Sequence, residues 1–160
     1  MPKAQRGFSL IELLIVVAII LIIAAIAIPN LMRSKMAANE ASAVGSLHSV
    51  NTSSAQYCST YGGYPPTLAS LGGPETGIPN ASSAELVDVV LASGTKSGYT
   101  FGYTAGPTDA NGNVLSYAVT AVPISAGVSG QRTFYTDQTN IIRVDATGTG
   151  TATANSTPIG

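Results

Sequence analysis

A single acidic residue, Glu12, stands at the start of an unbroken apolar run from Leu13 to Ile28. A charged side chain in hydrocarbon costs roughly 2.5 to 3.5 kcal/mol at the centre of a membrane helix, and less near an end. Glu12 therefore needs a cationic partner, which we expect to be distant in sequence. If the chain were cut after Gly7, the new amino group of Phe8 in a neighbouring copy would be such a cation. The sequence therefore indicates an assembly role for Glu12.

The apolar run is long enough to cross a membrane. From Phe8 to Ile28 there are 21 residues, and as a helix they would measure about 31 Å, against about 30 Å for a bilayer core. Lys3 and Arg6 place the N-terminus in the cytoplasm, although two further cations beyond the run oppose this orientation. An ordinary secretory signal, cleaved after Ala27, is the alternative, but its apolar core would usually be about 7 to 15 residues long.

The short basic leader, the pair Gly7 and Phe8, Glu12 four residues later and the long apolar helix form one pattern. It resembles the class III signal of type IV pilins, most closely a type IVa-like major pilin, and of type II secretion pseudopilins. The resemblance implies that a prepilin peptidase cleaves between Gly7 and Phe8 and methylates the new amine of Phe8. It also implies that Glu12 is the charge-pairing residue and that Pro29 is the helix proline of the family.

The same resemblance implies a function. The chain would be an inner-membrane precursor with one membrane span, which the pilus assembly machinery polymerises into a homo-oligomeric filament on the cell surface. Such a type IV pilus would serve cell adhesion, twitching motility or DNA uptake. The alternative is a major pseudopilin of a type II secretion system, and a membrane-anchored monomeric binding module is a third hypothesis, in which Gly7 and Glu12 would be dispensable.

The composition of the chain restricts other functions. Only 9% of the 160 residues are charged, against roughly 25% in a typical soluble domain. Removal of residues 1–7 would delete two cations and change the net charge from −1 to −3. Since there is no broad basic patch, we expect DNA to bind at most nonspecifically, through a few cations repeated along a filament.

The sequence offers no catalytic residues and implies no cofactor, so we expect a protein that is not an enzyme. His48 is the only histidine and Cys58 the only cysteine, which leaves no Cys or His cluster for a metal and no internal disulfide. The oxygen-bearing residues Asp109, Asn111 and Asn113 surround a glycine, as in part of a calcium loop. The twelfth position of such a loop is Thr120 rather than glutamate, and a polar hairpin turn is the simpler interpretation.

Beyond the span of residues 8–29, the pattern becomes that of an amphipathic helix over residues 30–60. Apolar residues recur at helical spacing at Met36, Ala43, Leu47, Val50 and Tyr57, so one face should pack against a globular head. Pro29 lacks a backbone donor and should kink the helix or open the segment before it. The resemblance to pilins implies that this segment loosens in the filament.

Residues 61–146 read as an α+β head, in which a four-stranded antiparallel sheet covers the apolar stripe of the helix, a pilin-like fold. The expected strands lie around Tyr99 to Tyr103 and over residues 116–122, 132–136 and 141–145. Residues 67–71 predict one helical turn, and Ser82 to Leu91 predict a second short helix with a capping-box start. Residues 147–160 are mostly Thr, Gly, Ala, Ser and Asn, which predicts a flexible tail.

Tyr57, Tyr61 and Tyr64 are spaced four and three residues apart near the predicted helix end. Two interpretations are open. The tyrosines can anchor the helix end against the head, with buried rings and hydroxyls in contact with water. Alternatively, together with Phe8, they resemble the aromatic paths for electrons that have been proposed for some pilins.

Overall fold

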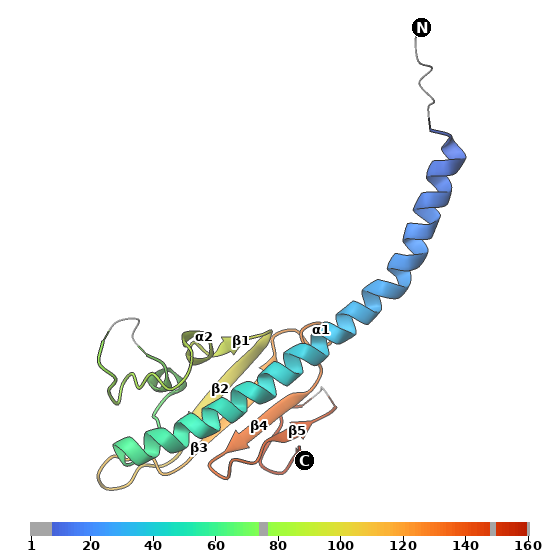
Figure 1. The fold of residues 1–160 in the computed structure, drawn as a ribbon. Helices are drawn as coiled ribbons and strands as arrows, with labels where there is room; N and C mark the ends of the chain where they lie inside the picture. Colours follow the sequence, from blue (N-terminus) through green and yellow to red (C-terminus); the bar gives the residue numbers. More distant parts are fainter. Residues whose placement is uncertain (1–7, 74–76, 148–149, 160) are drawn as a thin grey trace. The chain divides into compact units, whose positions relative to one another are not determined.

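The computed structural model describes residues 8–73, 77–147 and 150–159. Contacts between Cα atoms divide the chain into two compact units, Met1–Lys35 and Met36–Gly160. One helix, α1 (Leu10–Tyr61), runs through the boundary and contributes to both units. Figure 1 shows the order of the elements, with the sheet of the second unit beneath the later turns of α1.

In the first unit α1 carries only apolar residues from Leu13 to Ile28, and its large apolar side chains are exposed. The helix passes Pro29 without interruption, although this proline cannot donate a hydrogen bond to the carbonyl of Ala25, four residues earlier. The expected opening before Pro29 is therefore absent from the described helix. Loosening of this segment within a filament remains a prediction.

In the second unit α1 buries the predicted stripe. Ala43, Leu47, Val50 and Tyr57 are buried, whereas Met36 is half-buried. The helix ends at Tyr61 because Gly62 adopts a left-handed φ of 84° and donates its N–H to the carbonyl of Cys58 at 2.9 Å. This arrangement is a common helix terminator that favours glycine.

Over the described residues the sheet has six strands rather than the four expected, all antiparallel and in sequence order. The strands are β1 (Thr95–Lys96), β2 (Tyr99–Ala105), β3 (Tyr117–Pro123), β4 (Thr133–Asp137), β5 (Arg143–Asp145) and β6 (Thr157–Pro158). The four central strands β2 to β5 are those predicted from the alternation of apolar residues. The two edge strands have two residues each, which is too short to show a period of two.

The prediction of a helix over Ser82 to Leu91 was wrong. The helix present, α2 (Val89–Ala92), is much shorter, and Asp88 caps it by accepting a hydrogen bond from the Leu91 N–H at 2.9 Å. The region before it is extended: the N–H groups of Ala84 and Leu86 donate to the carbonyls of Ser70 and Leu71. These long-range backbone pairs oppose a helix, and so does the positive φ of Glu85, 55°.

The single helical turn predicted over residues 67–71 is confirmed as a 3-10 helix, η1 (Leu68–Leu71). The hydroxyl of Thr67 accepts a hydrogen bond from the Ser70 N–H and caps its start. Serine and threonine favour this position because their oxygen satisfies an N–H that the helix leaves free.

The segment predicted as a flexible tail, residues 147–160, is instead joined to the sheet over its described residues 150–159. Ala152 is almost completely buried, with 1% of its surface exposed. The hydroxyl of Thr133 accepts from the Ala152 N–H and donates to the Gly150 carbonyl. Strand β6 then pairs with β5. Hydrogen bonds to the backbone of this segment, rather than apolar content, hold it, which explains why its composition was misleading.

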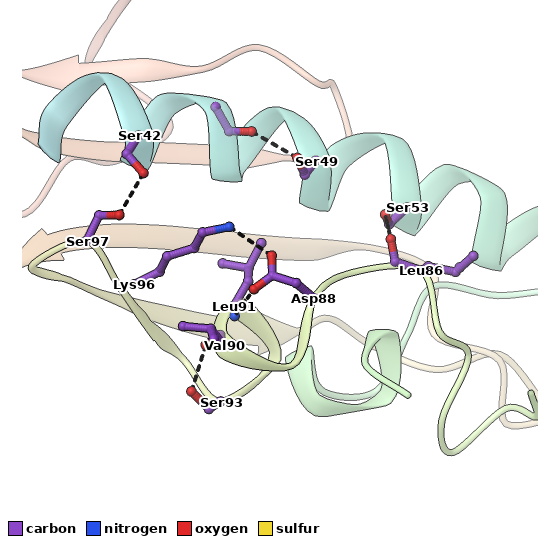
Figure 2. A network of polar contacts seen from close by, with 11 residues as sticks. Ser42, Ser49, Ser53, Leu86, Asp88, Val90, Leu91, Ser93, Lys96 and Ser97 are labelled. Atoms are coloured by element: carbon purple, nitrogen blue, oxygen red, sulfur yellow. Dashed lines mark hydrogen bonds and ion pairs between the residues drawn. The ribbon is translucent and has the colours of Figure 1, made fainter. Parts of the chain in front are cut away.

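The core of the second unit lies between α1 and the sheet. Its members come from α1, η1, α2 and the strands, including Leu47, Leu71, Leu91, Tyr99 and Phe134. Polar links at the edge of α1 accompany this packing, as Figure 2 shows: Ser42 bonds to Ser97, and Ser53 bonds to the Leu86 carbonyl, both at 2.8 Å. The loop region before β2 is therefore fastened to α1 at two points.

Candidate assembly site

Glu12 has a partner at the start of its own helix. The N–H of Ser9 donates to Oε2 of Glu12 at 2.9 Å, and the carbonyl of Ser9 accepts the first helical bond, from Leu13, at 3.3 Å. This is one half of a capping box, in which a glutamate at the third helical position reaches back to the backbone N–H of the cap residue. The spacing from Ser9 to Glu12 is the sequence signal that could have revealed it.

In this geometry the Glu12 carboxylate lies against the backbone at the start of α1. The positive end of the helix dipole favours an anion there. Oε1 of Glu12 accepts no hydrogen bond from the described residues, and Phe8 is 87% exposed. Oε1 of Glu12 is therefore available to accept a hydrogen bond from a donor outside the described residues.

The helix beyond Glu12 presents no further charge before Arg33. Its large apolar side chains are exposed by about half or more, from Leu10 at 77% to Leu31 at 70%. By length and composition it is the one helix among the described residues that could cross a membrane. A continuous apolar surface of this kind requires lipid or other apolar helices around it.

The other predicted site residues are not gathered at this point. Pro29 lies 17 residues after Glu12, which corresponds to about 25 Å along a helix. Gly7, and with it the bond predicted to be cleaved, lies outside the described residues. The structure thus describes Phe8 and Glu12 together at one end of α1 and Pro29 well along it.

The candidate calcium loop is a closed hairpin turn. The carboxylate of Asp109 accepts from the N–H groups of Asn111 and Asn113, both at 2.8 Å, and from Nδ2 of Asn113 at 3.1 Å. These bonds, led by the Asn113 backbone, lower the pKa of Asp109. Among residues 8–73, 77–147 and 150–159, no group of three His, Cys, Asp or Glu side chains is placed to hold a metal. The hydrogen bonds of Asp109 form the polar turn that the sequence predicts.

Glu40 is a second glutamate of α1, and its role was not predicted. It is 7% exposed, and its carboxylate accepts from the backbone N–H groups of Gln131 and Arg132 at 2.9 and 3.1 Å and from Nε of Arg132 at 2.7 Å. Burial raises the pKa of Glu40, but the hydrogen bonds and the guanidinium of Arg132 outweigh it, so the pKa lies below its ordinary value. The signal available was its position on the apolar stripe, three residues before Ala43.

A neutral polar cluster also joins α1 to the sheet. Asn51 is 4% exposed; its Nδ2 donates to the hydroxyl of Thr136 at 2.9 Å, and its Oδ1 accepts from the hydroxyl of Tyr117 at 3.0 Å. Together with Glu40, Asn51 fixes how the later turns of α1 sit on β3 and β4. Buried polar groups with satisfied hydrogen bonds specify such a position more sharply than apolar contacts do.

The tyrosines near the end of α1 anchor it in the head. Tyr57 is buried and donates its hydroxyl to the Ala81 carbonyl at 2.6 Å, and its ring centroid lies 4.6 Å from that of Tyr61. Tyr64 packs on Tyr117 at 4.9 Å. The buried ring predicted by the anchoring interpretation is confirmed for Tyr57, but its hydroxyl bonds to a carbonyl of the protein and not to water. Cys58, beside it, is half-buried and has a free thiol.

Comparison with known proteins adds three findings. The family model of the prokaryotic N-terminal methylation motif matches residues 2–28. The type II secretion system core protein G of Dickeya chrysanthemi is 33% identical over 72 residues, which cover 45% of this chain and 47% of that protein. The type IV wide pilus major component PilA4 of Thermus thermophilus is 55% identical over 38 residues, 24% of this chain and 29% of that protein.

These matches cover less than half the length of either relative. Solved structures give no match. The methylation motif includes Gly7, Phe8 and Glu12, the residues that carried the predicted resemblance. The resemblance of this chain to the type IV pilins and type II secretion pseudopilins is therefore confirmed.

Proposed function

We propose that the chain is the structural subunit of a type IV pilus, assembled from the inner membrane after cleavage between Gly7 and Phe8. The observation that carries the proposal is the lone carboxylate of Glu12 at the start of a helix whose apolar side chains are exposed. In the membrane these side chains contact lipid. In the filament they contact the same helix of neighbouring subunits.

Glu12 sets the register of that assembly. Its Oε2 is held by Ser9, while Oε1 receives the methylated amine of Phe8 from an adjacent subunit. A buried ion pair offsets its desolvation only when the geometry is good. The pair therefore favours the one axial position in which amine and carboxylate meet, and it contributes more to register than to net stability.

Filaments of this kind act at the cell surface in adhesion, twitching motility or DNA uptake, and the protein is not an enzyme. The head supports this role because Glu40 and Asn51 fasten it to α1, while most residues of the loop at 124–129 are exposed. The loops, rather than the helix, would then meet the surroundings of the cell.

A type II secretion pseudopilin is the second candidate, and the similarity to core protein G favours it. The resemblance to type II secretion pseudopilins implies a calcium site in the C-terminal region of a major pseudopilin. The Asp109 turn supports the pilus instead, because its carboxylate already accepts hydrogen bonds from the backbone and side chain of Asn113. Deletion of the gene separates the two. We expect surface fibres and twitching motility to disappear while secretion of folded enzymes continues; loss of secretion with fibres intact would identify the pseudopilin.

A further inference from the structure

A cavity of about 220 Å³ lies in the second unit, at the C-terminal end of α1. Three segments line it. They are the end of α1 with the residues just after it, which carry Tyr57, Tyr61 and Tyr64, the loop at Ala81, and the turn before β3 that contains Asn113. None of these residues belongs to the assembly site, so the cavity is independent of the proposed filament.

The aromatic walls of this cavity are fixed before any ligand arrives. Tyr57 is anchored by its hydroxyl to Ala81 and packs against Tyr61. Tyr64 packs against the buried Tyr117 and donates its backbone N–H to the Val114 carbonyl at 2.9 Å. Rigid tyrosines provide amphipathic contact area at a low cost in conformational entropy.

Three polar atoms on the lining residues lack partners. The hydroxyls of Tyr61 and Tyr64 and Oδ1 of Asn113 make no hydrogen bond with residues 8–73, 77–147 or 150–159. Nδ2 of Asn113 donates to the carboxylate of Asp109, which fixes the orientation of the amide and leaves Oδ1 free. The residues around the cavity therefore offer two hydroxyls and one acceptor.

Among the residues that the structure describes, none with a charged side chain lines the cavity. A phosphate, a carboxylate or an ammonium group would lose its hydration there without gaining an opposite charge. The volume is also below the roughly 300 to 1,000 Å³ of pockets that hold drug-sized ligands. The ligand that fits is small and neutral, with an apolar face for a tyrosine ring and several hydroxyls.

We propose that this cavity binds one neutral pyranose ring of a saccharide. The C–H face of the sugar packs on a tyrosine ring, and its hydroxyls bond to Tyr61, Tyr64 and Asn113. Because the rings and the amide are already held in place, little ordering accompanies binding.

Saturation-transfer NMR on the full chain tests this site, in a polyoxyethylene detergent that has neither a sugar nor a choline head group. The probes are the methyl pyranosides of glucose, galactose and mannose, and N-acetylglucosamine. We expect saturable transfer from at least one of them. The double variant Tyr61→Phe with Tyr64→Phe keeps both rings but removes two hydroxyls, and should weaken binding about tenfold.

Tyr135→Phe is the matched control, because it removes a tyrosine hydroxyl from β4, away from the cavity, and should leave binding unchanged. Thermal unfolding of all variants confirms that the head is folded. Absence of saturable transfer from all four sugars would overturn the proposal. So would equal affinity in the double variant, or binding of choline chloride in place of the sugars, which would indicate an aromatic site for a cation.

Discussion

The two glutamates of α1 differ in how their carboxylates are satisfied. Glu40, in the second unit, accepts three hydrogen bonds from Gln131 and Arg132 of the same chain. Glu12, in the first unit, accepts one, from Ser9, on a helix whose apolar side chains have no cover among the described residues. The chain itself therefore supplies the partners of Glu40 and of the buried face in the later part of α1. The beginning of α1 needs lipid or another copy of the chain to cover its apolar side chains.

The largest effect should come from removing the Glu12 carboxylate. We expect Glu12→Gln to abolish or severely slow filament formation, because the amide cannot pair as an anion with the Phe8 amine, while membrane insertion and unfolding of the head stay unchanged. Electron microscopy of sheared surface material and membrane fractionation measure these two effects. Glu85→Gln, which alters an exposed glutamate of the head, is the control. Normal filaments from Glu12→Gln would show that Glu12 has no role in assembly that distinguishes it from Glu40.

Removing the Glu40 carboxylate should have the reverse pattern. Glu40→Ala leaves the N–H groups of Gln131 and Arg132 without their acceptor, so we expect a loss of about 2 to 3 kcal/mol in the free energy of unfolding. Urea unfolding of the full chain in detergent, followed by circular dichroism, measures it. Glu85→Ala should change stability by less than about 0.5 kcal/mol. A similar small change in both variants would show that the bonds of Glu40 do not stabilise the head.

The same carboxylate should make the head sensitive to acid. Because the pKa of Glu40 is lower in the folded chain than its ordinary value of 4.5, its contribution is fully present above that value and is lost as the pH falls through the folded pKa. We expect the melting temperature of the wild type to fall more steeply below about pH 4.5 than that of Glu40→Gln. Parallel curves for the two proteins would contradict this assignment.

The smallest effect concerns the cap of α2. Asp88 accepts from the Leu91 N–H and also pairs with Lys96 at 2.8 Å on the surface. Asp88→Ala removes both interactions and should cost about 1 kcal/mol, chiefly through the cap. Asp88→Asn keeps a capping oxygen and should cost less, since exposed ion pairs contribute little. Urea unfolding compares the two, and equal losses would assign the effect to the ion pair instead.

Local sequence patterns predicted most of the fold. The alternation in β2 to β5 and the stripe from Ala43 to Tyr57 express local periods, and the chain follows them. The errors occurred where distant backbone decides the structure: residues 84–87 pair with residues 70–72 instead of forming a helix, and β6 is held by β5. A pattern of neighbouring residues cannot predict a hydrogen-bond partner that is distant in the sequence.

The candidate assembly site at Glu12 was predictable because its signal also lies in neighbouring residues of the sequence. A carboxylate beside an apolar run can be recognised from neighbouring residues alone, because the cost of placing its charge in hydrocarbon depends on that run. This pattern indicated Glu12. Glu40 was missed because its partners, Gln131 and Arg132, lie about ninety residues away. The Ser9 contact of Glu12 was within reach of the sequence, since the spacing of a capping box is itself a local pattern.

The central claim is that the beginning of the chain becomes the partner of Glu12 in another copy. Intact-mass spectrometry of the chain recovered from sheared surface material tests it most directly. We expect a polypeptide that begins at Phe8 and carries one methyl group on its amine. A polypeptide that begins at Met1, or after Ala27, would rule out this pairing, because no Phe8 amine would then exist to meet the Glu12 carboxylate.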